Sequence, residues 1–203
     1  MIIKDKTKLN KKCELVSSVE EGEEIGAQLL NELTTSKTGI GLAANQIGIN
    51  KRVCVINVKE PIVLVNPEIV EKSEEKFMFL EGCLSFPKKN VKTIRHNWVK
   101  VKADNHDGEL YFSTEDWPGS KNEDKKLESS YECACVQHEI DHLDGITMFD
   151  RKYKQPPLKR VGPKIGRNDK VTISNGSETK TLKFKKAESL LSGGEWQIQS
   201  LSS

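Results

Sequence analysis

Two histidines and a glutamate near residue 140 have the types and spacing that metal-dependent hydrolysis needs. His138 and His142 lie four residues apart, so on a helix both imidazoles can reach one metal ion. Glu139 is rotated by about 100° from His138 around such a helix, which places its carboxylate at the edge of the metal face as a base for water. A helix that merely displays two histidines fits the same HExxH pattern, so a third ligand must decide between these interpretations.

The third ligand is expected upstream of the two histidines. The residues that follow His142, LDGITMFDRKYK, contain no histidine and no glutamate, which argues against the arrangement of zincin-type peptidases. Cys83, within EGCLS at 81–85, follows a strand-like run, and its thiolate could complete a Cys-His-His site with one position open for water. For a lone cysteine, burial in the core is the alternative interpretation.

A helix and a strand end must position these ligands. Ser129 and Glu132 form a capping box, and Asp144 with Gly145 supplies a stop, so the sequence predicts a helix that begins at about Ser129. The apolar positions of this helix are Cys133, Val136, Ile140 and Leu143. The polar, turn-rich residues 114–128 that precede it predict a surface loop.

The remaining pattern predicts an α+β fold with mixed or antiparallel sheets. Ser18 and Glu21 form a second capping box, and apolar residues at four-residue spacing predict an amphipathic helix over 18–36. Runs of β-type residues between turn signals predict strands at 53–58, 62–66, 76–80, 98–103 and 109–113.

Composition is that of a soluble globular protein, and the N-terminal residues and the cysteines lead us to expect a cytoplasmic one. Hydrophobic residues make up 35% of the chain and charged residues 31%. The first residues contain no apolar signal-peptide core, and no window approaches a membrane span, so no membrane partner is expected. The five cysteines are odd in number and scattered, which fits a reducing compartment better than a disulfide framework.

The length of 203 residues suits one core-bearing domain with an appendage. We expect a catalytic domain at 1–150 and a basic C-terminal appendage at 151–203, in which Asn175 and Gly176 predict the turn of a short β-hairpin. Residues 151–186 hold twelve Lys or Arg against two acidic residues. This excess predicts either a transient contact with the ribosome or its RNA, or only a solvated tail.

Three motifs in a fixed order carry a family resemblance. GIGLAANQ at 39–46, EGCLS at 81–85 and HEIDH at 138–142 resemble the three signature motifs of peptide deformylases, and the likeness covers roughly residues 15–150, including LVNPEIV at 64–70. The resemblance implies a sheet framework around a central HExxH helix. It also implies an enzyme that removes the N-formyl group from N-formylmethionine of newly synthesised polypeptides and releases formate.

The resemblance implies a role for each motif residue. Cys83, His138 and His142 would hold one divalent metal ion, with Fe²⁺ favoured and Zn²⁺, Ni²⁺ or Co²⁺ as substitutes in a purified sample. Hydroxide at the metal would attack the formyl carbon, and Glu139 would act as general acid and base. The remaining implied role is oxyanion donation by the Gln46 side chain and the Leu84 N–H. Independently of the resemblance, Glu81 lies close before Cys83 and is hypothesised to orient a histidine ligand, with a surface carboxylate as the alternative.

The substrate pocket is expected from the glycine-rich motif and one face of the helix. Gly39 and Gly41 allow a close main-chain approach, and in the family this segment pairs with the substrate like an added strand. The methionine side chain is expected to meet Ile40, Phe86, Tyr131, Ala134 and Cys135. Core packing is the alternative for each of these five residues.

Two other functions remain as alternatives. A different metal-dependent amidase or peptidase would cleave acetylated or internal peptides instead of formylated ones. A degenerate metal-binding module would use the basic appendage as its functional part, but such a module would need no base, so the presence of Glu139 and Gln46 argues against it.

Overall fold

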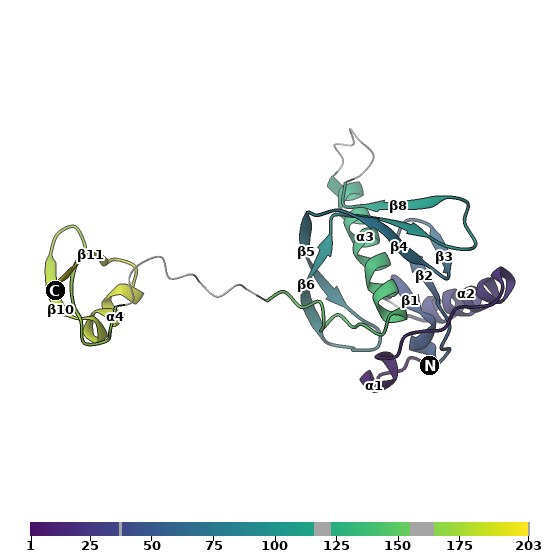
Figure 1. Cartoon of the computed structure of the whole chain (residues 1–203), viewed down its shortest axis with the longest axis horizontal. Helices are drawn as coiled ribbons and strands as arrows, with labels where there is room; N and C mark the ends of the chain where they lie inside the picture. The colour runs from purple at the N-terminus through teal and green to yellow at the C-terminus, as the bar shows by residue number, and fades with distance from the viewer. Residues whose placement is uncertain (37, 116–122, 155–164, 203) are drawn as a thin grey trace. The chain divides into compact units, whose positions relative to one another are not determined.

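The computed structural model describes residues 1–36, 38–115, 123–154 and 165–202 (Figure 1). The chain divides after Lys154 into two units, Met1–Lys154 and Gln155–Ser203. The elements described in the first unit are α1 (Lys6–Leu9), α2 (Val19–Thr34), the 3₁₀ helix η1 (Ala44–Ile47), α3 (Glu123–Leu143), β1 (Gly41–Ala43), β2 (Val53–Asn57), β3 (Pro61–Val65), β4 (Glu68–Lys72), β5 (Lys76–Gly82), β6 (Asn90–His96), β7 (Trp98–Lys102) and β8 (Glu109–Ser113).

The strands of the first unit form three antiparallel sheets with the orders β1-β2-β3, β4-β7-β8 and β5-β6. Helix α3 runs through the middle of the unit, with β5 and β6 on one side and the β1-β2-β3 sheet on the other (Figure 1). The predicted α+β class, with sheets around a central HExxH helix, is confirmed.

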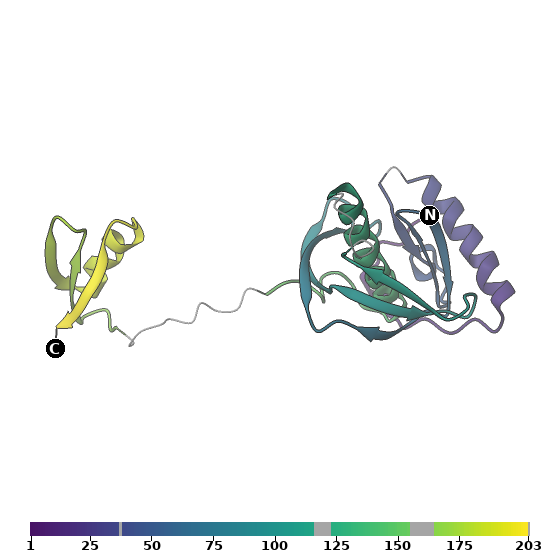
Figure 2. The same cartoon turned by 90° about the horizontal axis from the view of Figure 1, so that it is seen from above.

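Strand β2 is packed on both of its faces. Its residues alternate between two cores: Val53 and Val55 pack with α2, whereas Cys54 and Ile56 pack with α3. All four are fully buried. Helix α2 lies along the outer face of this sheet (Figure 2), so β1 is held between the α2 core and the helix that carries the motif histidines.

Helix α2 begins and ends close to the predicted bounds of 18–36. Ser18 is its N-cap, and the Ser18 hydroxyl accepts a hydrogen bond from the Glu21 N–H at 3.2 Å. The Glu21 carboxylate in turn accepts from the Ser17 N–H at 3.1 Å. Ile25, Leu29 and Leu33 are buried at the predicted four-residue spacing.

Helix α3 begins earlier than predicted, at Glu123 instead of about Ser129. The capping box at Ser129 lies inside the helix, because the preceding Glu, Lys and Leu residues are good helix formers and extend it toward the N-terminus. The predicted surface loop at 114–128 is therefore wrong for residues 123–128. Its residues 116–122 lie outside the described part of the chain.

Gly145 closes the turn after α3, three residues beyond the second motif histidine. Its φ of 72° lies in the left-handed region, and the Ile146 N–H donates to the Asp141 carbonyl at 2.8 Å. A Cβ at Gly145 would lie 2.8 Å from the backbone of Asn10, so the N-terminal segment packs directly against this turn.

All five predicted strands are present, but β1, β4 and β6 were missed. Strand β1 has three residues, and β4 is largely exposed. In β6 the inward positions include Thr93 and Arg95, so the strand lacks the apolar alternation by which a half-buried strand is recognised.

The second unit is a small sheet with one helix. Its described elements are β9 (Lys170–Ser174), β10 (Thr179–Lys183), α4 (Phe184–Ser192) and β11 (Gln197–Ser202). The sheet order is β10-β9-β11, all antiparallel, around a core of Val171, Ile173 and Ala187. Asn175 and Gly176 lie between β9 and β10, whereas α4 and β11 were not predicted. No described helix of either unit is long and apolar enough to cross a membrane.

Candidate metal centre and active site

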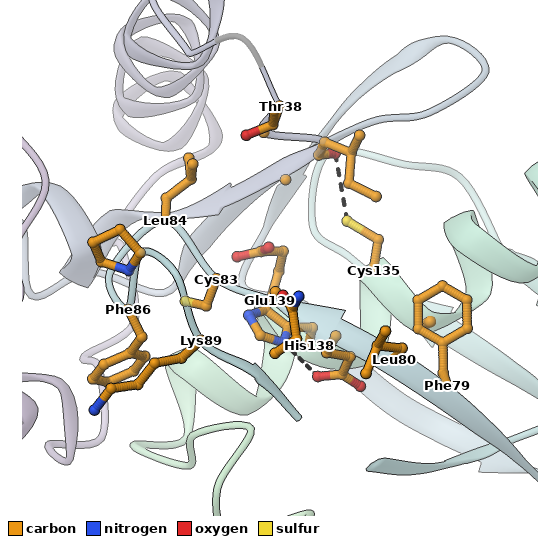
Figure 3. Close-up of a pocket in the computed structure, with 18 of the residues that line it drawn as sticks. Thr38, Phe79, Leu80, Cys83, Leu84, Phe86, Lys89, Cys135, His138 and Glu139 are labelled. Atoms are coloured by element: carbon orange, nitrogen blue, oxygen red, sulfur yellow. Dashed lines mark hydrogen bonds and ion pairs between the residues drawn. The ribbon is translucent and has the colours of Figure 1, made fainter. Parts of the chain in front are cut away.

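A pocket of about 420 Å³ opens beside α3 (Figure 3). Its walls come from segments that lie far apart in the sequence: residues 38–41, Gln46 of η1, and residues 79–84 and 86–90 around the end of β5. The face of α3 that completes it carries Tyr131, Ala134, Cys135, His138 and Glu139.

Cys83, His138 and His142 come together next to this pocket. The Cys83 Sγ lies 3.3 Å from the His142 Nε2, and the ligand atoms of all three residues lie within 4.8 Å of one another. Burial lowers the pKa of His142 well below its ordinary value, which favours the neutral ring that a metal ligand needs, whereas burial of His138 is outweighed by the contacts with Cys83 and Glu81, which raise its pKa. One thiolate and two imidazoles at this spacing fit a divalent transition-metal ion.

Glu81 fixes the orientation of the His138 ring. Its Oε2 lies 2.7 Å from the His138 Nδ1, which leaves Nε2 free for a ligand. Thr93 donates to the other carboxylate oxygen at 2.6 Å. Burial would raise the pKa of Glu81, but the hydrogen bonds from His138 and Arg95 outweigh it and hold the pKa well below its ordinary value.

A buried arginine, Arg95, connects Glu81 to Asp141 of α3. Arg95 donates from Nε and Nη2 to the two Glu81 oxygens at 2.5 and 2.9 Å, and from Nη1 to Asp141 at 2.5 Å. Asp141 also accepts two hydrogen bonds from Arg151, at 2.6 and 3.0 Å. Arg95 is only 3% exposed, so its guanidinium holds β5, β6 and α3 together.

Glu139 is a buried carboxylate with an unused oxygen. Burial raises its pKa to about 7. Its Oε2 has no hydrogen-bond partner among the described residues, although the atom is buried. The other oxygen faces Gly41, where a Cβ would lie only 2.6 Å from it. This carboxylate therefore has room and hydrogen-bonding capacity for a small polar ligand.

Gln46 and Leu84 line the same pocket from segments outside α3. The Gln46 Oε1 accepts from the Ala43 N–H at 2.9 Å, which orients the amide so that Nε2 points toward the EGCLS segment. There Nε2 donates to the Ser85 hydroxyl at 3.0 Å and lies 3.5 Å from the Cys83 Sγ. Leu84 follows Cys83 directly and lines the pocket.

The structure brings the predicted site residues together. The predicted residues that line the pocket beside α3 are Gly39, Ile40, Gly41, Gln46, Glu81, Cys83, Leu84, Phe86, Tyr131, Ala134, Cys135, His138 and Glu139. His142 is the exception, because it is fully buried behind Cys83. The Cys135 thiol donates to the Ile40 carbonyl at 3.4 Å, which joins the helix to the glycine-rich segment (Figure 3).

Sequence reasoning missed several residues around the site. Phe79 lines the pocket and packs edge-on against Tyr131, with 5.0 Å between ring centroids. It lies two residues before Glu81 on the same strand, so strand alternation could have placed both on one face. The pairing of Arg95 with Glu81 and Asp141 left no such signal, because it depends on the register between strands.

The comparisons with known proteins agree with this geometry. A family model described as polypeptide deformylase matches residues 1–157. The chain is 34% identical over 173 residues to a peptide deformylase of Prochlorococcus marinus strain AS9601, which covers 82% of this chain and 79% of that one. It is 39% identical over 147 residues to a peptide deformylase of Natranaerobius thermophilus, which covers 70% of this chain and 85% of that one.

Solved structures of the same kind share the fold. The crystal structure of peptide deformylase from Thermotoga maritima superimposes with a TM-score of 0.64 and 29% identity, covering 76% of this chain and 97% of that chain. That of a probable peptide deformylase from Synechococcus phage S-SSM7 gives 0.60 and 34%, covering 74% and 98%. The family match spans the whole pocket and its three candidate metal ligands. The chain therefore belongs to the peptide deformylase family.

Proposed function

We propose that this protein is a metal-dependent hydrolase that removes the N-formyl group from N-formylmethionine of newly synthesised polypeptides and releases formate. The observation that carries the proposal is the position of the Glu139 carboxylate. It lines the same pocket as the ligand candidates Cys83 and His138 and lies close to both (Figure 3). Because polypeptides begin on ribosomes, we place the enzyme in the cytoplasm.

The three donors define what the metal would contribute. A divalent ion held by Cys83, His138 and His142 would polarise the formyl oxygen and lower the pKa of a water molecule. We favour Fe²⁺ on the family resemblance. Zn²⁺, Ni²⁺ or Co²⁺ could substitute for it, because thiolate and imidazole ligands accept all of these ions. The bond from Glu81 to the His138 Nδ1 supports this role, because it holds the ring with Nε2 toward the ion.

Glu139 moves the proton. With its pKa near 7, the carboxylate can take a proton from the attacking water at neutral pH and then deliver it to the leaving amine. Its Oε2 has no other hydrogen bond to break among the described residues. Burial also keeps bulk water from competing for this proton.

Gln46 and Leu84 stabilise the negative charge that develops on the formyl oxygen. The Gln46 amide is held by the Ala43 N–H, so its Nε2 donor is already oriented before substrate arrives. The Leu84 backbone N–H supplies the second donor from the segment that carries Cys83. Fixed donors of this kind need no rearrangement in the transition state.

The pocket walls select a short, unbranched apolar side chain. Aromatic and aliphatic groups from three elements line it, among them Ile40, Phe79, Phe86, Tyr131, Ala134 and Cys135. We place the methionine side chain of the substrate against these groups. Gly39 and Gly41 would pair with the peptide main chain, because no side chain at these positions keeps the strand away.

Substrate discrimination tests the proposal. Metal-loaded protein is given three substrates: a formyl-Met tripeptide, the matching acetyl-Met tripeptide, and a longer peptide whose two ends are blocked so that only internal bonds can be cleaved. The release of formate, acetate or new amines is measured. We expect release from the formylated peptide only. Equal cleavage of the acetylated peptide would indicate a broader amidase, and cleavage of the internal bond would indicate a peptidase.

A further inference from the structure

A second cleft, of about 960 Å³, lies on the opposite side of α3 from the active-site pocket. The two share no lining residue. The residues of α3 and its end that line the second cleft are Gln137, Ile140, Asp141 and Asp144. Its other walls come from residues 12–15, from β4 and the ends of β5 and β6, and from residues 150–154. A ligand here would therefore leave the active site open.

The cleft has an excess of positive charge. Eight Lys or Arg and four Asp or Glu residues line it. The floor is neutralised internally: Arg52 pairs with Asp144 at 2.6 Å, and Asp141 is shared by Arg95 and Arg151. The lysines, by contrast, form no ion pair with any described residue, and they are Lys12, Lys72, Lys76, Lys152 and Lys154. All five are exposed and free to contact an anion.

These lysines come from three segments of the chain, near residue 12, at 72–76 and at 152–154. Lys76 is the cross-strand neighbour of His96, which also lines the cleft. Burial lowers the pKa of His96, and the charges of Lys76, Lys72 and Arg151 lower it further. The hydrogen bond to the Ser73 carbonyl opposes this shift, and the lowered pKa agrees with the excess of positive charge among the lining residues.

An aromatic side chain lies among these charges. Tyr153 lines the cleft and is 36% exposed. Its backbone N–H donates to the Lys92 carbonyl at 2.8 Å, and Lys152 forms a β-bridge with Thr93, so this segment is held against β6. An anchored aromatic ring beside unpaired lysines is the combination by which proteins bind single-stranded nucleic acids.

We propose that this cleft binds single-stranded RNA, with the lysines on phosphates and Tyr153 stacked on a base. Five lysines from separate segments of the cleft lining match a chain of phosphates better than one compact anion. The choice of RNA over other polyanions rests on the proposed function, because newly made polypeptides emerge from ribosomes, whose surface is largely RNA. The site lies on the first unit and does not need the appendage.

Two triple variants of the full-length protein separate the cleft from the appendage. The first is Lys72→Gln, Lys76→Gln and Lys152→Gln. The matched control, with the same charge change, is Lys183→Gln, Lys185→Gln and Lys186→Gln in the second unit, where all three lysines are exposed. Fluorescence anisotropy with an unstructured RNA of about 12 nucleotides measures binding, and formate release from a formyl-Met peptide is measured on the same samples.

The expected result is a selective loss of RNA binding in the cleft variant. If the five lysines each contact a phosphate, the logarithmic salt slope should be about −3.5 for the wild type and about −1.4 for the cleft variant. The control should keep the wild-type slope, and both variants should deformylate normally. Tyr153→Leu should weaken binding about tenfold through lost stacking.

Three results would overturn the proposal: no RNA binding by the wild type, an unchanged slope in the cleft variant, or equal losses in both variants. Tighter binding of double-stranded RNA or of heparin would replace single-stranded RNA by another polyanion. RNA binding is read independently of catalysis. If no sample deformylates, the proposed function fails, and the anisotropy result still decides whether the cleft binds RNA.

Discussion

Replacement of Arg95 tests whether the buried ion-pair network positions the metal ligands. Arg95→Met keeps the length of the side chain but removes the bonds to Glu81 and Asp141. Removing one partner of a buried ion pair costs about 3–5 kcal/mol. Thr93 and His138 remain as partners for Glu81, and Arg151 remains for Asp141, so we expect a value near the lower end, about 3 kcal/mol.

The same change should weaken metal binding. Loss of a group that orients a ligand typically costs about 10–100-fold in metal affinity, and Arg95 acts one residue further away, through Glu81, so about tenfold is expected. Hydrogen exchange of peptides from β5, β6 and α3, with and without metal, measures the local stability. Chelator competition measures the metal affinity.

Arg151→Met is the matched comparison for Arg95→Met. Arg151 contacts the same Asp141, but its side chain is 45% exposed and does not touch Glu81. We expect a stability loss of about 1 kcal/mol or less and unchanged metal affinity. If Arg95→Met lost no more stability than Arg151→Met and bound metal as tightly as the wild type, the positioning role would be refuted.

Three further substitutions probe the pocket and the end of α3. Gly41→Ala places a methyl 2.6 Å from the Glu139 carboxylate and should lower kcat by about 100-fold without unfolding the protein, as steady-state kinetics and circular dichroism would show. Gln46→Leu removes an oxyanion donor and should lower kcat by about 100-fold or more at unchanged metal content. Gly145→Ala combines a φ of 72° with a contact 2.8 Å from Asn10 and should reduce the free energy of unfolding by about 2 kcal/mol, measured by urea denaturation.

Local spacing made most of the site predictable. The four-residue interval between His138 and His142 directs both rings the same way on any helix, and Tyr131, Ala134 and Cys135 follow from the same geometry. The placement of Cys83 and Gln46 beside that helix came from the order of the motifs. No local rule connects residues so far apart in the sequence.

The supporting network could not be predicted from sequence. Arg95 reaches Glu81 because β5 and β6 pair in a register that sets Glu81 opposite Val91. A shift of one residue would turn Arg95 to the other face of the sheet. The polar inward positions of β6 also concealed the strand itself.

The start of α3 was misjudged for a related reason. The box formed by Ser129 and Glu132 matches an N-terminal signal, but capping residues also occur inside helices when the preceding residues favour helix and the face is covered. Here Ser129 is only 2% exposed, inside a helix that began at Glu123. The helix propensity of residues 123–128 therefore outweighed the capping signal at Ser129.

The most direct test of the central claim couples metal binding to formate release. Metal-free full-length protein is titrated anaerobically with Fe²⁺, and metal binding and formate release from a formyl-Met tripeptide are followed together for the wild type and Glu139→Gln. We predict that activity reaches its plateau at one ion per chain. Glu139→Gln should bind the ion equally but react slower by a factor of about 100 or more. Formate release without metal, or at the wild-type rate in Glu139→Gln, would contradict the account.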